Sequence, residues 1–150
     1  MKARNHPSPT IRPATADDYE QMVAVWSACG MRISLAGRES KEAFQRQLQQ
    51  FPDSYLVAIH GSQVVGVVLG SHDHRKGWIN RLAVLPAYRR RGFASALVLA
   101  CEAAIRSLGI KIVAALVEPG NTSSAALFEK LGYLEDVPVR YFRKLDRADV

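Results

Sequence analysis

The sequence predicts one α+β domain built on a mixed β-sheet, and three observations lead to this prediction. Short β-rich runs separated by tight turns fill the middle of the chain, where they predict an antiparallel meander. A long helix with one apolar face follows them, and a nearly continuous apolar run comes after that helix. The length of 150 residues, of which 48% are hydrophobic, suits a single domain with a substantial core.

The first third of the chain predicts a strand followed by two helices. Ile11-Arg12 closes a short first strand, and Thr15 is expected to cap a helix that ends near Gly30. Ser40 is expected to cap a second helix, which Pro52 ends. Residues 1–9, with two prolines and little apolar content, predict a flexible N-terminal tail before a single domain over residues 10–150.

The meander is predicted from a change of period to short β-rich runs. Strands are expected at Tyr55–His60, Val64–Leu69 and Trp78–Val84. Gly61-Ser62 is a two-residue hairpin signal, and a second turn is expected around Asp73–Gly77.

The last third of the chain predicts a long helix that starts at the basic segment and continues to about Ser107. Lys111–Val117 is nearly all apolar, which predicts a strand covered on both faces. Pro119-Gly120-Asn121 introduces a short helix that ends near Leu131. Final strands are expected at Tyr133–Leu134 and Val139–Leu145.

The charge balance favours anionic ligands, because the chain has 20 basic and 14 acidic residues and a formal charge of +6. Nucleic acid is not expected as the partner, since the one dense basic run is Arg89–Arg91 and no recognition signature accompanies it. No metal is expected, because Cys29 and Cys101 have no metal-ligand spacing and His72-Asp73-His74 is predicted to be a solvated turn. No signal peptide or membrane span is visible, so a cytoplasmic location without membrane contact is expected.

The segment from Arg89 to Ala94 joins the last strand of the meander to the long helix, and it predicts an anion site. The first backbone N–H groups of a helix have no partner inside it, and the helix dipole favours negative charge there. Gly92 lets a ligand approach the backbone, because glycine has no Cβ. The segment matches neither GxxxxGK(S/T) nor GxGxxG, so it is not one of the usual nucleotide-binding loops.

Two further motifs stand in this order of elements. The first motif is Leu82-Ala83-Val84-Leu85-Pro86 followed by Arg89-x-x-Gly92-x-Ala94. The second is Asn121, then Ala125-Ala126-Leu127-Phe128, then Lys130-Leu131-Gly132-Tyr133. With these motifs the chain resembles the GNAT superfamily of acyl-CoA N-acyltransferases over about Thr10 to Leu145. The resemblance implies a GNAT-like acyl-CoA N-acyltransferase fold, with a mixed sheet splayed at the CoA site and helices on both faces.

The resemblance also implies how CoA would bind. Backbone N–H groups would hold the CoA pyrophosphate, and the pantetheine arm would pair with the last meander strand like an added strand. Asn121 would bond to that arm, and Phe128 would pack near the thioester, although the same residues also suit a helix cap and a core aromatic. The implied cofactor-binding residues are Leu82, Ala83, Val84, Arg89, Arg90, Arg91, Gly92, Phe93, Ala94, Ser95, Asn121 and Phe128.

Catalysis is where the chain departs from the family pattern. Many members have a tyrosine as general acid where Phe128 stands, and phenylalanine cannot donate a proton. An alkylamine has a pKa of about 10.4, so a base or a water chain must deprotonate it before attack. The catalytic candidates are Glu118 as base or water-positioning group, and Tyr133 or Tyr141 as acid.

The resemblance therefore implies an acetyl-CoA-dependent N-acetyltransferase that moves acetyl directly to a primary amine of a small molecule, amino acid or peptide. The segment 30–50, with Arg32, Arg38 and Lys41, is expected to form part of the acceptor wall, and its basic character favours an acceptor with a carboxylate. The alternative is a non-catalytic acyl-CoA-binding or sensing module, which the missing tyrosine motivates. The expected partners are a CoA thioester and an amine acceptor, and a homodimer is left open.

Overall fold

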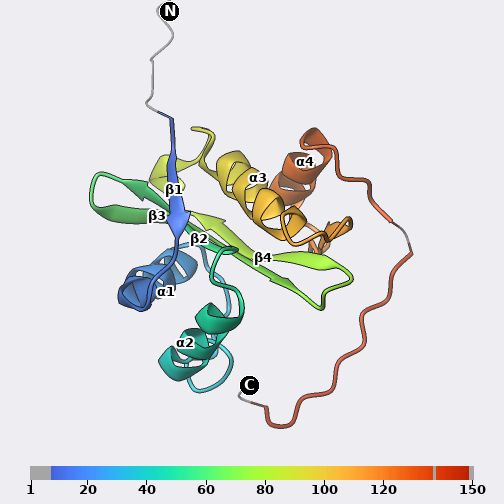
Figure 1. The fold of residues 1–150 in the computed structure, drawn as a ribbon, viewed down its shortest axis with the longest axis horizontal. Helices are drawn as coiled ribbons and strands as arrows, with labels where there is room; N and C mark the ends of the chain where they lie inside the picture. Colours follow the sequence, from blue (N-terminus) through green and yellow to red (C-terminus); the bar gives the residue numbers. More distant parts are fainter. Residues whose placement is uncertain (1–7, 137, 149–150) are drawn as a thin grey trace, which may run out of the picture.

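The computed structural model describes residues 8–136 and 138–148 of the chain (Figure 1). Its elements follow the predicted order of strand, two helices, meander, long helix, strand and short helix. In chain order they are β1 (Thr10–Pro13), η1 (Ala16–Asp18), α1 (Tyr19–Ala28), α2 (Lys41–Gln50), β2 (Tyr55–His60), β3 (Gln63–His72), β4 (Gly77–Val84), η2 (Pro86–Tyr88), α3 (Phe93–Arg106), β5 (Val113–Ala115) and α4 (Thr122–Lys130), where η marks a short 3-10 helix.

The strands form one mixed sheet in the order β1-β2-β3-β4-β5. The pairs β1–β2, β2–β3 and β3–β4 are antiparallel, whereas β5 runs parallel to β4. A tight turn joins β2 to β3, and Gly61 supplies the positive φ, 63°, that such hairpin turns favour. The parallel pair needs a longer crossover, which α3 provides.

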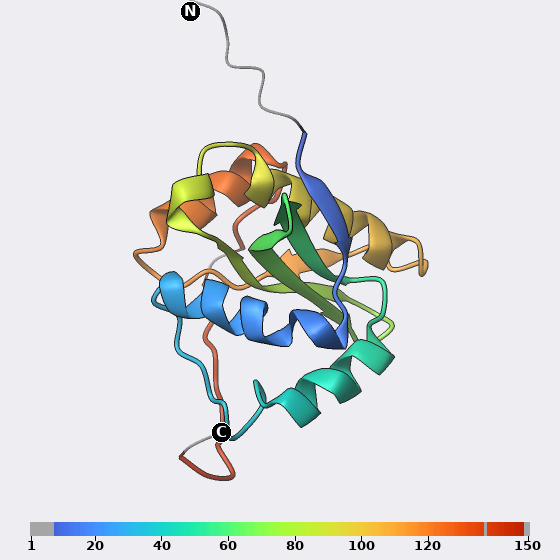
Figure 2. The same ribbon diagram turned by 90° about the vertical axis from the view of Figure 1, so that its left-hand side faces the viewer.

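Helices cover both faces of the sheet, with α1 and α2 on one side and α3 and α4 on the other (Figures 1 and 2). Each face has its own core. Trp26 of α1 and Phe44 of α2 pack in one, and Leu97 of α3 and Phe128 of α4 pack in the other. The predicted α+β class, with helices on both faces of a mixed sheet, is confirmed.

A β-bulge interrupts β4 next to β3. Val67 pairs with Ala83 and Leu69 pairs with Asn80, so two residues of β4 lie opposite a single residue of β3. One of the two, Arg81, has a φ of 54°, which is rare for any residue except glycine. Such a bulge bends its strand and redirects its side chains, and here it does so in the middle of the meander.

The chain after α4 differs from the prediction. No strand forms at Tyr133–Leu134 or Val139–Leu145 within the described residues, and the segment runs extended around the outside of the molecule (Figure 1). Its apolar side chains are exposed, as Leu134 at 90% and Phe142 at 80% illustrate. Side-chain alternation favours a strand only where a sheet edge accepts its backbone hydrogen bonds, and here none does.

Two other boundaries also shift. The strand expected over Lys111–Val117 is limited to Val113–Ala115, and Ile112 and Leu116 beside it are 56% and 59% exposed, so burial on both faces was wrong. The long helix begins at Phe93 and not within the arginines, which lie in a turn before it.

Residues 1–7 of the expected N-terminal tail lie outside the described residues. In the part of the chain that is described, we find no helix with the length and apolar character needed to cross a bilayer.

Candidate functional site

The ladder between β4 and β5 ends halfway along β4. It runs from the pair Gly77–Val113 to the pair Ile79–Ala115, whereas β4 continues to Val84. Within the described sheet, residues 80–84 therefore have a strand partner only on the β3 side. An open strand edge of this kind can bond an extended ligand that carries amides, as if the ligand were a further strand.

The turn between β4 and α3 has an unusual backbone. Arg90 and Gly92 both have positive φ, 60° and 82°, within three residues. A Cβ added at Gly92 would meet no atom within 4 Å, so the space above the turn is open. Successive peptide groups in such a turn can aim their N–H groups at one point and form a concave anion site.

The start of α3 adds further donors to this turn. The Ala96 N–H donates to the Gly92 carbonyl at 3.0 Å, so the N–H groups of residues 93–95 precede the first helical hydrogen bond. The helix dipole favours an anion at the same place. Arg89 differs from the expectation, because its N–H donates to the Pro86 carbonyl at 3.3 Å and only its side chain remains for a ligand.

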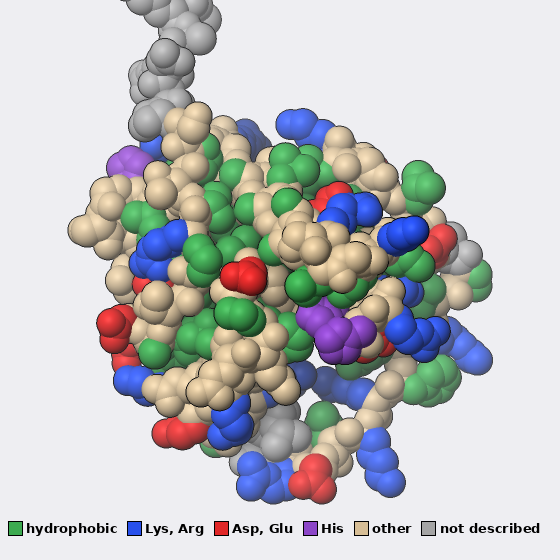
Figure 3. Space-filling model, viewed as in Figure 1, with side chains coloured by type: hydrophobic (Ala, Val, Ile, Leu, Met, Phe, Trp, Pro, Cys, Tyr) green, Lys and Arg blue, Asp and Glu red, His purple; other side chains and the backbone are tan. Residues whose placement is uncertain are grey.

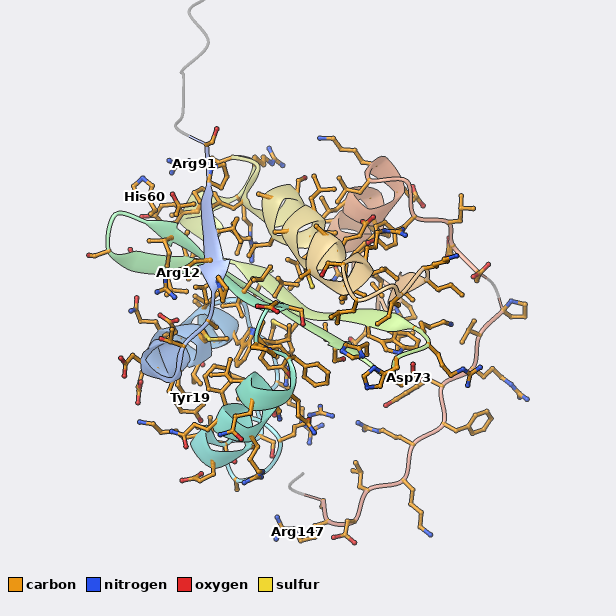
Figure 4. All side chains as sticks on the ribbon, viewed as in Figure 1. Arg12, Tyr19, His60, Asp73, Arg91 and Arg147 are labelled. Carbon is orange, nitrogen blue, oxygen red and sulfur yellow. The ribbon has the colours of Figure 1, made fainter. Side chains whose placement is uncertain are left out.

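The Arg89 and Arg91 side chains contact neighbouring groups. Arg89 Nε donates to the Val84 carbonyl at 3.2 Å, and its Nη2 lies 3.6 Å from the thiol of Cys29. The Arg91 guanidinium lies over the rings of Tyr88 and Phe93, with its Cζ 5.1 and 5.8 Å from their centroids. The two guanidinium groups therefore contribute a positive field beside the turn, at the end of the molecule where Figure 4 labels Arg91.

Asn121 begins α4 as predicted. Its Oδ1 accepts the Ser124 N–H at 3.2 Å, which is the hydrogen bond of an N-cap. Before it, the Asn121 N–H donates to the Glu118 carbonyl at 3.1 Å and Gly120 has a φ of 90°, as in a type II turn after Pro119. The Glu118 side chain is exposed on this turn.

Phe128 and Tyr133 pack against α3. Phe128 is 8% exposed, and its ring meets the ring of Tyr133 edge-on with 5.1 Å between centroids. The Tyr133 hydroxyl donates to Glu102 Oε2 at 2.9 Å. Burial, together with the neighbouring Glu102 carboxylate, raises the pKa of Tyr133 well above the usual value for a tyrosine. The Tyr133 proton is therefore held firmly and shared with an acid on α3.

Tyr141 lies on the extended C-terminal segment, where its side chain is 71% exposed. No hydrogen bond between described residues joins Glu118, Tyr133 and Tyr141. The three catalytic candidates thus lie in three separate places: the turn before α4, the end of α4 where it packs against α3, and the exposed C-terminal segment.

The sequence analysis missed Arg81 and Glu39. The Arg81 guanidinium at the β4 bulge forms an ion pair with Glu39, which lies just before α2. Burial alone would raise the pKa of Glu39, but hydrogen bonds from Arg81 and from the Ser34 N–H outweigh it and lower the pKa. The two residues are 42 positions apart, so no local sequence pattern predicts their pairing. The one available signal was that Arg81 is the only charged residue within β4.

The histidine turn lies away from these groups. Figure 4 shows Asp73 and Arg91 at opposite ends of the molecule. Asp73 Oδ1 accepts the N–H groups of Arg75 and Lys76, both at 2.9 Å, as expected for an exposed turn. Figure 3 shows histidine side chains grouped on this face, yet no set of three metal-ligating side chains occurs among the described residues.

Comparisons with known proteins identify the family of the chain. The sequence model of the protein family described as the acetyltransferase (GNAT) family matches residues 16–133 of this chain. An acetyltransferase of Sodalis glossinidius is 31% identical over 123 residues, which cover 82% of this chain and 85% of the relative.

Two solved structures have a similar fold. The PaiA N-acetyltransferase of Thermoplasma acidophilum, in complex with coenzyme A, has a TM-score of 0.74 at 21% identity, over 88% of this chain and 94% of that one. The aminoglycoside N-acetyltransferase AAC(6′)-Iy, in complex with a bisubstrate analogue, has a TM-score of 0.72 at 19% identity, over 93% and 99%. At such identities the two structures show the shared fold alone.

The hydrogen bond between Tyr133 and Glu102 predicts a stability effect. We expect Tyr133→Phe to lower the free energy of unfolding by about 1–2 kcal/mol, because Glu102 loses a half-buried donor. Tyr141→Phe is the matched control and should change the free energy of unfolding by less than about 0.5 kcal/mol, since its side chain is exposed. Urea denaturation measures both, and equal effects would contradict the anchoring of Tyr133.

Proposed function

Because the chain belongs to the GNAT family of acetyltransferases, we propose that it transfers the acetyl group of acetyl-CoA directly to a primary amine. The observation that carries the proposal is the open edge of β4 leading into the positive-φ turn before α3. An extended chain of amides ending in a pyrophosphate matches both parts, because the strand edge pairs amides and the turn binds anions.

The donor would lie along β4 with its thioester toward the bulge. Leu82, Ala83 and Val84 would pair with the pantetheine amides, and backbone N–H groups from Arg90 to Ser95 would hold the pyrophosphate. The Arg89 and Arg91 side chains would add charge around it. Asn121 would hydrogen-bond the pantetheine arm while it caps α4. Phe128 would pack beside the thioester end of that arm, on the α4 side.

The acceptor would approach from the side of α1 and α2. Two observations support an amine that also carries a carboxylate, such as an amino acid or a peptide end. Arg32 and Arg38 are exposed on the segment between the two helices. Glu39, the acid of that segment, is paired with Arg38 and with Arg81 of β4, so these groups together with the exposed Arg32 keep a net positive charge that attracts an anion.

The reaction needs no covalent enzyme intermediate. The acceptor nitrogen forms a C–N bond to the acetyl carbon, the C–S bond breaks, and the thiolate leaves with its electron pair. The nitrogen must lose one proton and the thiolate gains one. Glu118 is our candidate for ordering the water that takes the amine proton, because it is exposed on the turn before Asn121.

The acid role has two candidates, Tyr133 and Tyr141. The first already donates a hydrogen bond to Glu102, and the second is exposed on the extended segment after α4. A thiol pKa of about 8.5 makes acid catalysis useful without making it obligatory, so water could protonate the leaving thiolate. We therefore expect only a modest loss of kcat when either tyrosine is removed.

A non-catalytic acyl-CoA sensor is the second candidate, and Phe128 favours it because it cannot donate a proton. Thiol release from acetyl-CoA, measured against amines supplied in pairs with and without a carboxylate, separates the two functions. The enzyme predicts turnover, with the carboxylate-bearing member of a pair preferred. Calorimetric binding of CoA without turnover of any amine would favour the sensor, and absence of CoA binding would contradict both.

The pyrophosphate turn yields a prediction for Gly92→Val. We expect the affinity for CoA to fall more than 100-fold, because the new side chain enters the open space above the turn. Calorimetric titration with CoA measures the effect. The matched control is Gly109→Val, since Gly109 has the same φ of 82° and equally open surroundings at the far end of α3.

Both valines impose a backbone strain of about 1–3 kcal/mol, so the control separates strain from blockage. Gly92→Ala and Gly109→Ala form a milder pair if a valine variant unfolds. Arg90→Ala should weaken CoA binding less than tenfold, because backbone donors carry most of the contact. Normal CoA affinity in Gly92→Val would show that the pyrophosphate binds elsewhere.

The proton-transfer roles yield a prediction for Glu118→Gln. We expect kcat to fall about 10²- to 10⁴-fold, as for loss of a general base or of the water that it orders. The affinity for CoA should stay within twofold. Glu135→Gln, a similar change on the exposed chain after α4, is the matched control. An unchanged kcat in Glu118→Gln would contradict this role and show that the amine loses its proton without help from Glu118.

A further inference from the structure

Arg81 occupies an exceptional backbone position. It is one of the two residues in the β4 bulge, and its φ of 54° places it in the left-handed region. Its carbonyl accepts the Trp26 indole N–H at 3.1 Å, and its guanidinium carbon lies 5.6 Å from the centre of the same ring. The bulge is therefore held on both sides by the end of α1.

The guanidinium of Arg81 continues into the segment between α1 and α2. Nη1 donates to the Arg32 carbonyl at 2.8 Å, and Nη2 donates to the Glu39 carboxylate. The other oxygen of Glu39 accepts the Ser34 N–H at 2.9 Å. The segment 31–40, which we call the acceptor loop, is thereby closed on itself by Glu39 and joined to β4 by Arg81.

Burial makes these hydrogen bonds and the ion pair costly to break. Glu39 is 7% exposed, and the side chain of Arg81 is 16% exposed. A buried charge that loses its partner is strongly destabilised, so neither group can leave the other at low cost. Burying two ions gains little stability over an apolar pair, so stability alone does not account for an ion pair at this point.

We propose that Arg81 and Glu39 are a positioning pair, which fixes the acceptor loop to the bulge of β4 and thereby sets the place of the amine relative to the thioester. The inference rests on the proposed function, since it concerns the geometry of that transfer. One end of the pair belongs to the strand along which the donor would lie, and the other to the loop that the acceptor would meet. The pair aligns the two substrates and takes no proton itself.

Positioning has a kinetic signature that differs from a donor-binding or a base role. Displacing an acceptor by about 1 Å from its attack geometry can cost about 100-fold in rate. We expect Glu39→Gln to lower kcat/KM for the amine by about 10- to 100-fold, with the Kd for CoA within twofold. The acidic limb of the pH–rate profile should remain, because the group that deprotonates the amine is still present.

The chain offers a closely matched control in Arg12 and Asp18, near the opposite edge of the sheet. Asp18 is 4% exposed, accepts two bonds from Arg12 at 2.7 and 2.8 Å, and accepts the Thr15 N–H at 2.8 Å. Asp18→Asn should therefore destabilise the protein comparably to Glu39→Gln. It should leave kcat/KM for the amine within twofold.

A conservative change tests whether the two-pronged bonding of the Arg81 guanidinium is needed. Arg81→Lys keeps the charge but cannot bond Arg32 and Glu39 together, so it should behave like Glu39→Gln. The double variant should lose little more than either single variant, because the two residues act as one unit. Additive losses would contradict the pair.

Amide hydrogen exchange of residues 31–40, measured on the full chain with CoA bound, provides a readout that is independent of turnover. Glu39→Gln should increase exchange there more than tenfold relative to wild type, and Asp18→Asn should not. Equal exchange in the two variants, or equal losses of kcat/KM, would overturn the proposal. If wild type turns over no amine, the proposed function fails, and the exchange result still decides whether the pair fixes the loop.

Discussion

The structure depends on one constraint: β4 must stay bonded to β3 along its length while it separates from β5 partway. The two parallel strands part after Ile79 and Ala115, and the bulge at Arg81 lies directly beyond that point. A bulge increases local bend and twist, so it carries the rest of β4 away from β5 without a break in the meander. The open edge, the turn that follows and the start of α3 all take their places from this bend.

The turn before α3 shows how backbone and side chains divide the work. Its N–H groups are directed by the positive φ values of Arg90 and Gly92, whereas the Arg89 and Arg91 side chains contact Val84, Tyr88 and neighbouring groups. A site made from peptide groups is rigid and needs little reorganisation when an anion arrives. Tyr141, proposed as one of two candidate acids, lies by contrast on an extended segment, where its side chain is 71% exposed.

Local signals predicted much of the fold. Ser40 and Asn121 cap the helices that their sequences indicated, and Tyr55–His60 forms the strand that its apolar run predicted. The position of the bulge at Arg81 could not be predicted, because it is a property of pairing between two strands and not of either one alone. The link between Glu39 and Arg81 joins distant parts of the chain, and the expected strand at Val139–Leu145 pairs with no edge of the described sheet.

The separation of the core into two clusters has an evolutionary consequence. The sheet lies between the cluster under α1 and α2 and the cluster under α3 and α4, and few side chains contact both. Substitutions confined to one cluster are therefore largely shielded from the other, except where Trp26 and the segment after α1 bond to Arg81 of β4. A lineage with this architecture can vary the α1–α2 layer with little disturbance to the α3–α4 layer, as long as it keeps that connection.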